Sequence, residues 1–169
     1  MKEDFDKSIA ILDLACGTGI IGEALAKLGY TEIVGIDGSA KMLEVAEQKK
    51  CYKKLEQGMI GMGTFPKEFV YKFDVVIATG MFSKGHVTPA GADDIIAALR
   101  SGGLAFFSVR DDYVDELGYS AKFKLLEEEG QWELKEAIPF DNYASNEGHK
   151  FLYPSKNKIY VYRRTGTGI

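Results

Sequence analysis

A glycine-rich run and a later aspartate have the types and spacing of a ligand-binding loop. Gly17, Gly19 and Gly22 follow the pattern G-x-G-x-x-G, and Asp37 comes about 18 residues after Gly19. Such a loop, between a strand and a helix, brings backbone N–H groups close to a ligand because no side chain obstructs them. An aspartate that ends the next strand can accept hydrogen bonds from both hydroxyls of an adenosine ribose. By spacing alone, the pattern fits a nicotinamide dinucleotide as well as S-adenosylmethionine.

The presence of Asp13 distinguishes between these two ligands. It lies inside the apolar run before the loop, four positions ahead of Gly17. A carboxylate there suits the sulfonium and ammonium groups of S-adenosylmethionine, whereas the two phosphates of a dinucleotide disfavour an anion beneath them. The chain also closes within about 60 residues of its fifth expected strand, where a dehydrogenase usually adds a further substrate or nucleotide unit. A buried carboxylate satisfied by the protein itself is the structural alternative for Asp13.

Short apolar runs alternate with amphipathic stretches, which is typical of βαβ units around a parallel sheet. We expect strands over residues 9–14, 32–36, 55–57, 73–78, 104–109, 132–138 and 158–162. We expect helices over residues 20–28, 39–50, 89–100 and 122–129. Ser39 and Thr88 are the expected N-caps of the second and third helices, Pro89 opens the third, and Gly102-Gly103 breaks it.

The composition narrows the class of protein. A net charge of -4 with 46% hydrophobic and 27% charged residues is ordinary for a globular protein, and argues against a nucleic-acid partner. The two cysteines and two histidines form no paired motif, so we expect no metal. No apolar run reaches the roughly 18 residues of a membrane span, so we expect no membrane partner and a cytoplasmic location. We expect a single domain over residues 1–164 and a disordered tail over residues 165–169.

Four segments resemble class I S-adenosylmethionine-dependent methyltransferases. Residues 12–19 resemble their first motif and residues 34–43 their ribose-binding turn. Residues 73–78 resemble their fourth strand and residues 99–106 the passage from helix to fifth strand. The resemblance implies a three-layer, doubly wound, Rossmann-like α/β fold whose seven-stranded, mostly parallel sheet has the order 3-2-1-4-5-7-6, with the last strand antiparallel. It also implies S-adenosylmethionine across the carboxyl ends of strands 1, 2 and 4.

A narrower resemblance rests on three shorter features. Cys51-Tyr52, Gly85-His86-Val87, and Trp132 with the late Val161-Tyr162-Arg163 are similar to the methyltransferase-like proteins named after the Williams–Beuren syndrome region. This resemblance implies no particular substrate.

The residue types and the resemblance together define a candidate cofactor site. The expected cofactor-binding residues are Asp13, Ala15, Cys16, Gly17, Gly19, Asp37, Gly38, Met42, Met59, Ile60, Ala78 and Thr79. Asp37 is the expected ribose ligand, and helix capping is a competing or additional role. Met42 either packs on the adenine or belongs to the core. Residues 57–62 lack the acid that often binds the adenine amino group, so adenine would depend on backbone groups near Met59 and Ile60.

The segment after the fourth strand should border the transferred methyl group. Phe82 could face the sulfonium or simply pack. His86 is the candidate general base, and a loop histidine without a chemical role is the alternative. The loop that holds Tyr143, Glu147 and His149 could cover the acceptor.

The expected activity is in-line displacement that moves a methyl group to a small-molecule acceptor, with a protein acceptor less favoured. Only about eight residues precede the first strand, where many small-molecule methyltransferases have extra helices. A core that binds S-adenosylmethionine without turnover, or only with a partner, is therefore the first alternative. An NAD(P)-dependent oxidoreductase is the second.

Overall fold

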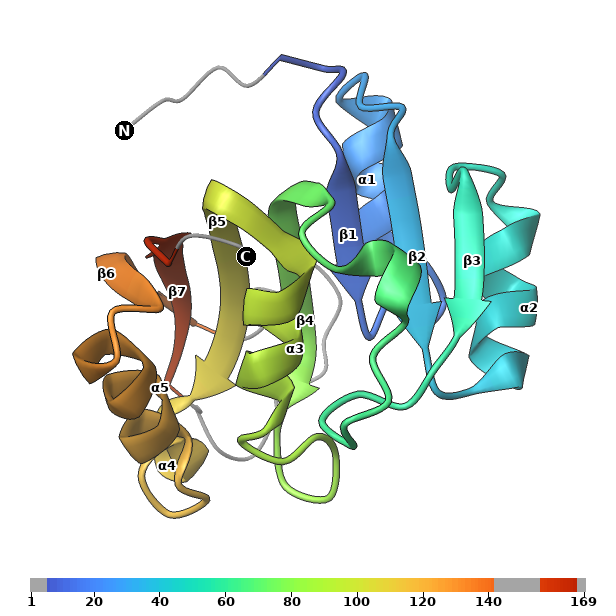
Figure 1. The fold of residues 1–169 in the computed structure, drawn as a ribbon. Helices are drawn as coiled ribbons and strands as arrows, with labels where there is room; N and C mark the ends of the chain where they lie inside the picture. Colours follow the sequence, from blue (N-terminus) through green and yellow to red (C-terminus); the bar gives the residue numbers. More distant parts are fainter. Residues whose placement is uncertain (1–5, 142–155, 167–169) are drawn as a thin grey trace.

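A mixed sheet forms the middle layer of the computed structural model, which describes residues 6–141 and 156–166 (Figure 1). Its strands are β1 (Ile11–Leu14), β2 (Ile33–Asp37), β3 (Lys54–Gln57), β4 (Phe73–Phe82), β5 (Leu99–Arg110), β6 (Trp132–Asp141) and β7 (Lys156–Arg164). The helices are α1 (Ile20–Lys27), α2 (Ala40–Gln48), α3 (Gly91–Ala98), α4 (Asp111–Val114) and α5 (Tyr119–Glu128), with a 3₁₀ turn, η1 (Lys67–Phe69).

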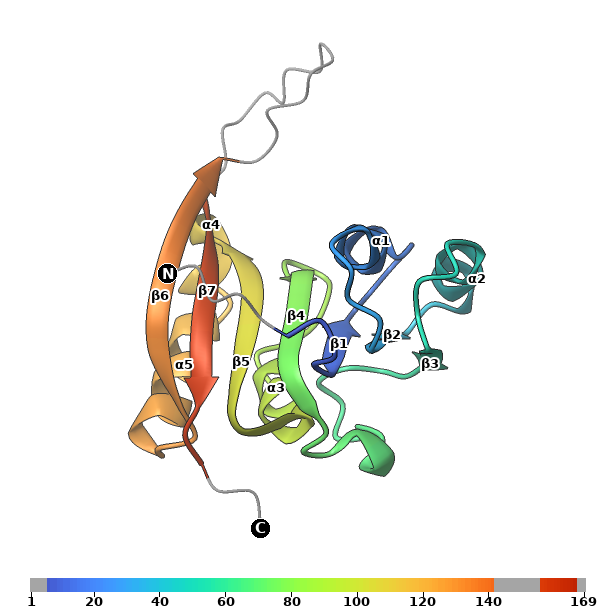
Figure 2. The ribbon, with the colours of Figure 1, turned by 90° about the horizontal axis from the view of Figure 1, so that it is seen from above.

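The strand order confirms the expected topology. The sheet has seven strands in the order β3-β2-β1-β4-β5-β7-β6. β1 pairs in parallel with β2 and β4, whereas β7 is antiparallel to both β5 and β6. Helices α1 and α2 lie on one face, beside β1 to β3, and α3 and α5 lie on the other (Figure 2). The carboxyl ends of β1, β2 and β4 therefore meet at one edge, as the rule for open α/β sheets requires.

Burial follows the apolar pattern of the sequence. All of β1 is buried, as expected for a central strand covered on both faces. The core on the α3 and α5 face continues into an aromatic cluster in which Phe107 contacts Phe82, Phe123 and Trp132, with ring centroids 5.0 to 5.8 Å apart. This cluster fixes the end of β4 against β5 and α5.

The third helix begins later than its capping signal predicts. Ala90 is the N-cap and makes no side-chain capping bond, so the expectation that Thr88 caps the helix and Pro89 opens it is wrong. The Gly91 N–H donates to the Thr88 carbonyl at 2.9 Å, and the Ala92 N–H to that of Pro89 at 3.1 Å. These bonds span three residues, so the chain makes a tighter turn before the α-helix starts.

The same helix also ends earlier than expected. It stops at Ala98, and Leu99 is already extended, with φ −72° and ψ 136°. Gly102 and Gly103 therefore lie within β5 and do not end the helix. A Cβ at Gly103 would lie 2.9 Å from the Asp74 carbonyl oxygen, so this glycine permits a close approach of β4 to β5.

In the second half of the chain, other helix and strand boundaries also differ from those expected. β4 and β6 are longer than expected, and the short α4 follows β5 directly. Thr165 and Gly166, the described part of the expected tail, both donate backbone hydrogen bonds to the Gln131 carbonyl, at 3.0 and 3.2 Å. The remaining tail residues, 167–169, lie outside the described residues. None of the helices in the described part of the chain is long and apolar enough to span a membrane.

Candidate functional site

The loop between β1 and α1 has the backbone that its glycines predict. Gly17 and Gly19 have positive φ values of 53° and 79°, and Ala15 also has a positive φ, of 60°. The Cys16 N–H donates to the Ile36 carbonyl at 2.9 Å, which ties the loop to β2. A Cβ at Gly17 would meet no atom within 4 Å, so the loop faces open space at this residue. A ligand can approach the backbone there.

Asp37 joins this loop to the start of α2. Its Oδ2 accepts from the Gly17 N–H at 2.8 Å, and its Oδ1 accepts from the Ser39 N–H at 2.8 Å. Ser39 is the N-cap of α2 and accepts from the Met42 N–H at 3.4 Å, as the sequence predicts. Each carboxylate oxygen has two lone pairs, so these bonds leave capacity for further donors on the half-exposed side chain.

Asp13 lies beneath the loop and has protein partners of its own. Its side chain is buried, and the Tyr52 hydroxyl donates to its Oδ2 at 2.6 Å. The Gly22 backbone N–H, in the first turn of α1, lies close enough to lower the pKa of this carboxyl group. Burial nevertheless raises the pKa of Asp13 to about 6. The described contacts match the structural alternative, a buried carboxylate satisfied by the protein.

Cys16 does not have the properties of a nucleophile. Its side chain is buried, and burial together with the nearby Asp13 and Asp37 raises the pKa of its thiol to about 12. A thiol held in this state behaves as a small apolar side chain.

Methionines surround the segment after β2. A Cβ at Gly38 would lie 3.0 Å from the Met59 sulfur, and the Gln57 amide donates to the Gly38 carbonyl at 3.1 Å. Met42 and Met59 are both exposed, at 45% and 59%. Met42 is therefore not a core residue, and both thioethers remain available to a flat apolar ligand group.

Two of the expected ligand-binding residues point into the core. Ile60 and Ala78 are both buried members of the core that includes Leu14 and Ile36. Their side chains are unavailable, so only their backbone groups could take part in binding.

Asp94 is a buried acid that the sequence analysis missed. Its Oδ2 accepts from the Gly61 N–H at 2.6 Å, which fixes the loop after β3 to the start of α3. Burial raises the pKa of this carboxyl group. Its position in the first turn of a helix was the available signal.

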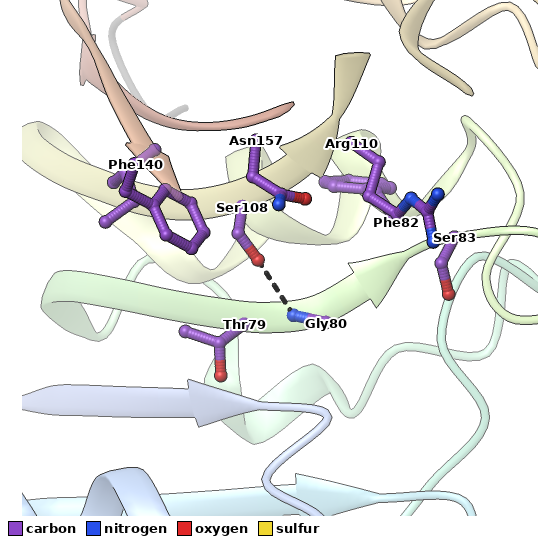
Figure 3. A pocket seen from close by; sticks show the side chains of 9 residues that line it. Thr79, Gly80, Phe82, Ser83, Ser108, Arg110, Phe140 and Asn157 are labelled. Carbon is purple, nitrogen blue, oxygen red and sulfur yellow. Dashed lines mark hydrogen bonds between the residues drawn. The ribbon is translucent and has the colours of Figure 1, made fainter. Parts of the chain in front are cut away.

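A pocket of about 470 Å³ opens at the ends of β4 and β5 (Figure 3). The Gly80 N–H donates to the Ser108 Oγ at 2.9 Å, and the pairing of β4 with β5 shifts register between Ala78 and Phe82. This irregular stretch of β4 forms one wall, and the start of β7 and the end of β6 form the other. The lining residues are Thr79, Gly80, Phe82, Ser83, Ser108, Arg110, Phe140, Asn157 and Ile159.

The pocket combines apolar rings with polar groups. Phe140 contributes aromatic surface, and Arg110 supplies the single formal charge among the described lining residues. The Arg110 guanidinium carbon lies 4.7 Å from the centre of the Tyr113 ring, which stacks against it. Asn157 is buried at the pocket wall. Such a mixture suits a small organic molecule with a polar group.

Phe82 and His86 differ in their relation to this pocket. The Phe82 ring is buried and packs 5.0 Å from the Tyr119 ring, which matches the packing alternative for this residue. His86 is exposed in the turn after β4, where its backbone N–H donates to the Ser83 carbonyl at 3.0 Å. It is not among the lining residues. Tyr143, Glu147 and His149, named above as a possible cover, lie outside the described residues.

Known proteins match both the sequence and the fold. The chain matches the methyltransferase domain family over residues 11–103. It is 34% identical to human methyltransferase-like protein 27 over 139 residues, which is 79% of this chain and 55% of that protein. It is 30% identical over 151 residues to a ubiquinone biosynthesis O-methyltransferase of Thiobacillus denitrificans, covering 86% of this chain and 59% of that protein. The chain thus spans little more than half the length of these relatives.

The fold also matches that of a solved bacterial structure. A TehB-like S-adenosylmethionine-dependent methyltransferase from Corynebacterium glutamicum superposes with a TM-score of 0.67 at 21% identity, over 95% of this chain and 83% of that one. The family match covers the glycine loop, Asp37 and β4 together, and it favours S-adenosylmethionine over the nicotinamide alternative. The chain belongs to the class I S-adenosylmethionine-dependent methyltransferase family.

Proposed function

We propose that this chain transfers a methyl group from S-adenosylmethionine to a small-molecule acceptor bound in the pocket at the ends of β4 and β5. The observation that carries this proposal is the position of the two sites on one edge of the sheet. β1 and β4 run in parallel and pair through Asp13 and Ile77. The glycine loop after β1 therefore lies at the same edge of the sheet as Thr79 of β4. The Thr79 side chain points toward β1 from the pocket wall (Figure 3).

The residues around the glycine loop fit the cofactor. Open space at Gly17 would admit the methionine portion against the backbone, and Asp37 would accept from the ribose hydroxyls. Met42 and Met59 offer exposed thioethers for contact with the adenine. Gly19, Gly38 and Thr79 would complete the site. Ala15, Cys16, Ile60 and Ala78 would contribute only through their backbone, and Asp13 would act from beneath the loop.

The chain's own residues would align the acceptor with the activated methyl group that the bound cofactor supplies. The volume of about 470 Å³ is that of a small-molecule site. The aromatic ring of Phe140 would exclude water, and Asn157 and Arg110 would orient a polar group of the acceptor. Positioning of this kind can supply most of the acceleration of a displacement reaction.

A general base is needed only for an acceptor that arrives protonated. The sequence predicts His86 as this base. Its exposed position in the turn after β4 would restrict this role to an acceptor that extends out of the pocket.

Binding and transfer can be tested separately. We expect S-adenosylmethionine and S-adenosylhomocysteine, but not NAD, to raise the melting temperature of the chain. Incubation of the chain with methyl-labelled S-adenosylmethionine and a small-metabolite fraction should then release a labelled product. The variant Asn157→Leu should lower product formation while leaving the affinity for S-adenosylhomocysteine unchanged. Binding without any labelled product would instead support the alternative, a core that binds the cofactor without turnover or only with a partner.

A further inference from the structure

The third glycine of the G-x-G-x-x-G motif faces a tyrosine. A Cβ at Gly22 would lie 2.2 Å from Cζ of Tyr52, far too close for two non-bonded carbon atoms. Gly22 lies inside α1 and does not have a positive φ, so the helix itself would accept another residue there. The glycine is therefore needed for space and not for backbone conformation.

Two further glycines complete a slot for the same ring. A Cβ at Gly19 or at Gly35 would lie 3.0 Å from a Tyr52 ring carbon. These glycines come from the loop after β1 and from β2, whereas Gly22 comes from α1. Tyr52 itself follows α2, and its ring thus passes between three elements to reach the interior of the site.

At the end of this slot the Tyr52 hydroxyl meets the buried carboxylate of Asp13. The oxygen atoms are 2.6 Å apart, the length of a strong hydrogen bond to a charged acceptor. The Gly22 N–H, in the first turn of α1 directly after the glycine loop, also lowers the pKa of this carboxyl group. Asp13 therefore lies between Tyr52 and the start of α1.

We propose that Tyr52 is a positioning residue for cofactor binding, which holds the Asp13 carboxylate and, through it, the glycine loop and the start of α1. In this arrangement Gly22 admits the Tyr52 ring and does not contact the cofactor. The third motif glycine and Tyr52, which is 30 residues further along the chain, form one unit.

The charges around Asp13 indicate why a donor is required there. Asp37 at the end of β2 lies close enough to raise the pKa of Asp13 further, in addition to burial, while the Tyr52 hydroxyl and the Gly22 N–H lower it. Asp13 in turn contributes to raising the pKa of the Cys16 and Cys51 thiols. Without the hydroxyl, Asp13 would protonate at a higher pH and would lose the negative charge that a cationic ligand favours.

The first test compares Tyr52→Phe with the wild-type chain by calorimetric titration of S-adenosylhomocysteine between pH 5.5 and 8.5. We expect the pH at which affinity falls to move upward by about one unit, with affinity at pH 6.5 reduced about threefold and affinity at pH 8.5 nearly unchanged. The ligand's own amino group titrates equally in both experiments, so any difference between the two pH profiles arises from a group of the protein. Tyr30→Phe, at the end of α1 with its ring beneath Lys7, is the matched control and should keep the wild-type profile.

An effect of Tyr52→Phe on affinity that does not depend on pH would overturn the proposal. If Tyr52→Phe lowers affinity by the same factor at every pH, or leaves it unchanged, the hydroxyl serves packing alone.

A double-mutant cycle tests the role of Gly22. Gly22→Ala alone should weaken binding at least tenfold, because the methyl group displaces the Tyr52 ring. In the Tyr52→Ala background the same substitution should cost less than twofold, since the ring is gone. If Gly22→Ala costs as much in both backgrounds, Gly22 serves the cofactor directly and the proposal fails. Thermal unfolding of all four proteins shows whether each one is folded at the titration temperature.

Discussion

The Gly17 backbone N–H and the Asp37 Oδ2 lie 2.8 Å apart, and this bond ties the end of β2 to the loop that follows β1. The second oxygen of Asp37 binds the Ser39 N–H at the start of α2. A single carboxylate thus sets the spacing between the glycine loop and the second helix. The same side chain can organise the loop and accept hydrogen bonds from a ribose, so the two roles considered for Asp37 are compatible.

Replacing Asp37 should therefore weaken both the fold and the site. In Asp37→Asn an amide NH₂ group faces one of the two backbone donors, so one hydrogen bond is lost. We expect the free energy of unfolding to fall by about 1–2 kcal/mol and the affinity for S-adenosylmethionine to fall more than tenfold. Urea unfolding and calorimetric titration measure the two effects. Asp6→Asn, at an exposed turn where the carboxylate accepts from the Ser8 N–H, should leave affinity unchanged.

Asp13 should reduce stability at neutral pH. Its pKa is raised from 3.8 to about 6, so the folded chain binds a proton that the unfolded chain releases between these values. The group therefore destabilises the fold increasingly as the pH rises through this window, and the penalty is complete above it. Asp13→Asn removes the titration, so its stability relative to the wild type should be about 2 kcal/mol more favourable at pH 7.5 than at pH 4.5.

Urea unfolding of both proteins at the two pH values measures this difference, because all other carboxylates contribute equally to both. A stability difference that does not change with pH would contradict the assignment. Cofactor affinity at pH 7.5 should fall in Asp13→Asn even where its stability rises.

Gly17 should be sensitive to a methyl group for two separable reasons. Its positive φ makes Gly17→Ala strained by about 1 kcal/mol, and the added Cβ would occupy the open space where the ligand approaches. Gly102 has a similar φ, of 78°, and equally open surroundings within β5. Both alanine variants should lose similar stability in thermal unfolding, but only Gly17→Ala should lose binding of S-adenosylhomocysteine. Equal binding by the two variants would show that the cofactor does not contact this residue.

Arg164 should be important for stability and not for the site. Its buried guanidinium donates to the Ile96 and Leu99 carbonyls at the end of α3 and stacks 4.3 Å from the centre of the Tyr71 ring. Arg164→Met leaves these two buried acceptors without their donor, which should lower the free energy of unfolding by about 2–4 kcal/mol. Arg100→Met, which breaks an exposed pair with Asp74, should cost less than about 1 kcal/mol. Denaturant unfolding compares the two, and both variants should retain cofactor affinity.

His86 should have at most a small effect on turnover with an acceptor that fits the pocket. The residue is exposed and absent from the pocket lining, so we expect His86→Gln to lower kcat less than about tenfold. Steady-state rates with the acceptor identified from the labelling experiment provide the measurement. A loss of about a hundredfold or more with unchanged cofactor affinity would instead establish His86 as the general base.

Local sequence signals predict the βαβ order, the glycine loop, the capping of α2 by Ser39 and the position of Asp37 after β2. These features depend on local signals: apolar periodicity, glycine conformation and a capping side chain, each contained within a few neighbouring residues. The strand order came from the family resemblance. Where a local signal failed, as at Thr88 and Gly102, the ends of α3 were set by the tighter turn before it and by pairing with β4.

The contacts beneath and beside the glycine loop depend on how distant elements pack. The Tyr52 hydroxyl on Asp13, the Asp94 carboxylate on Gly61 and the Ser108 hydroxyl on Gly80 all join residues between 28 and 39 positions apart. A hydrogen bond between distant residues depends on how elements pack, and one sequence carries no local signal for it. The glycine motif therefore predicts a ligand site from local sequence alone, whereas the reason for its third glycine lies in the Tyr52 ring that packs against it.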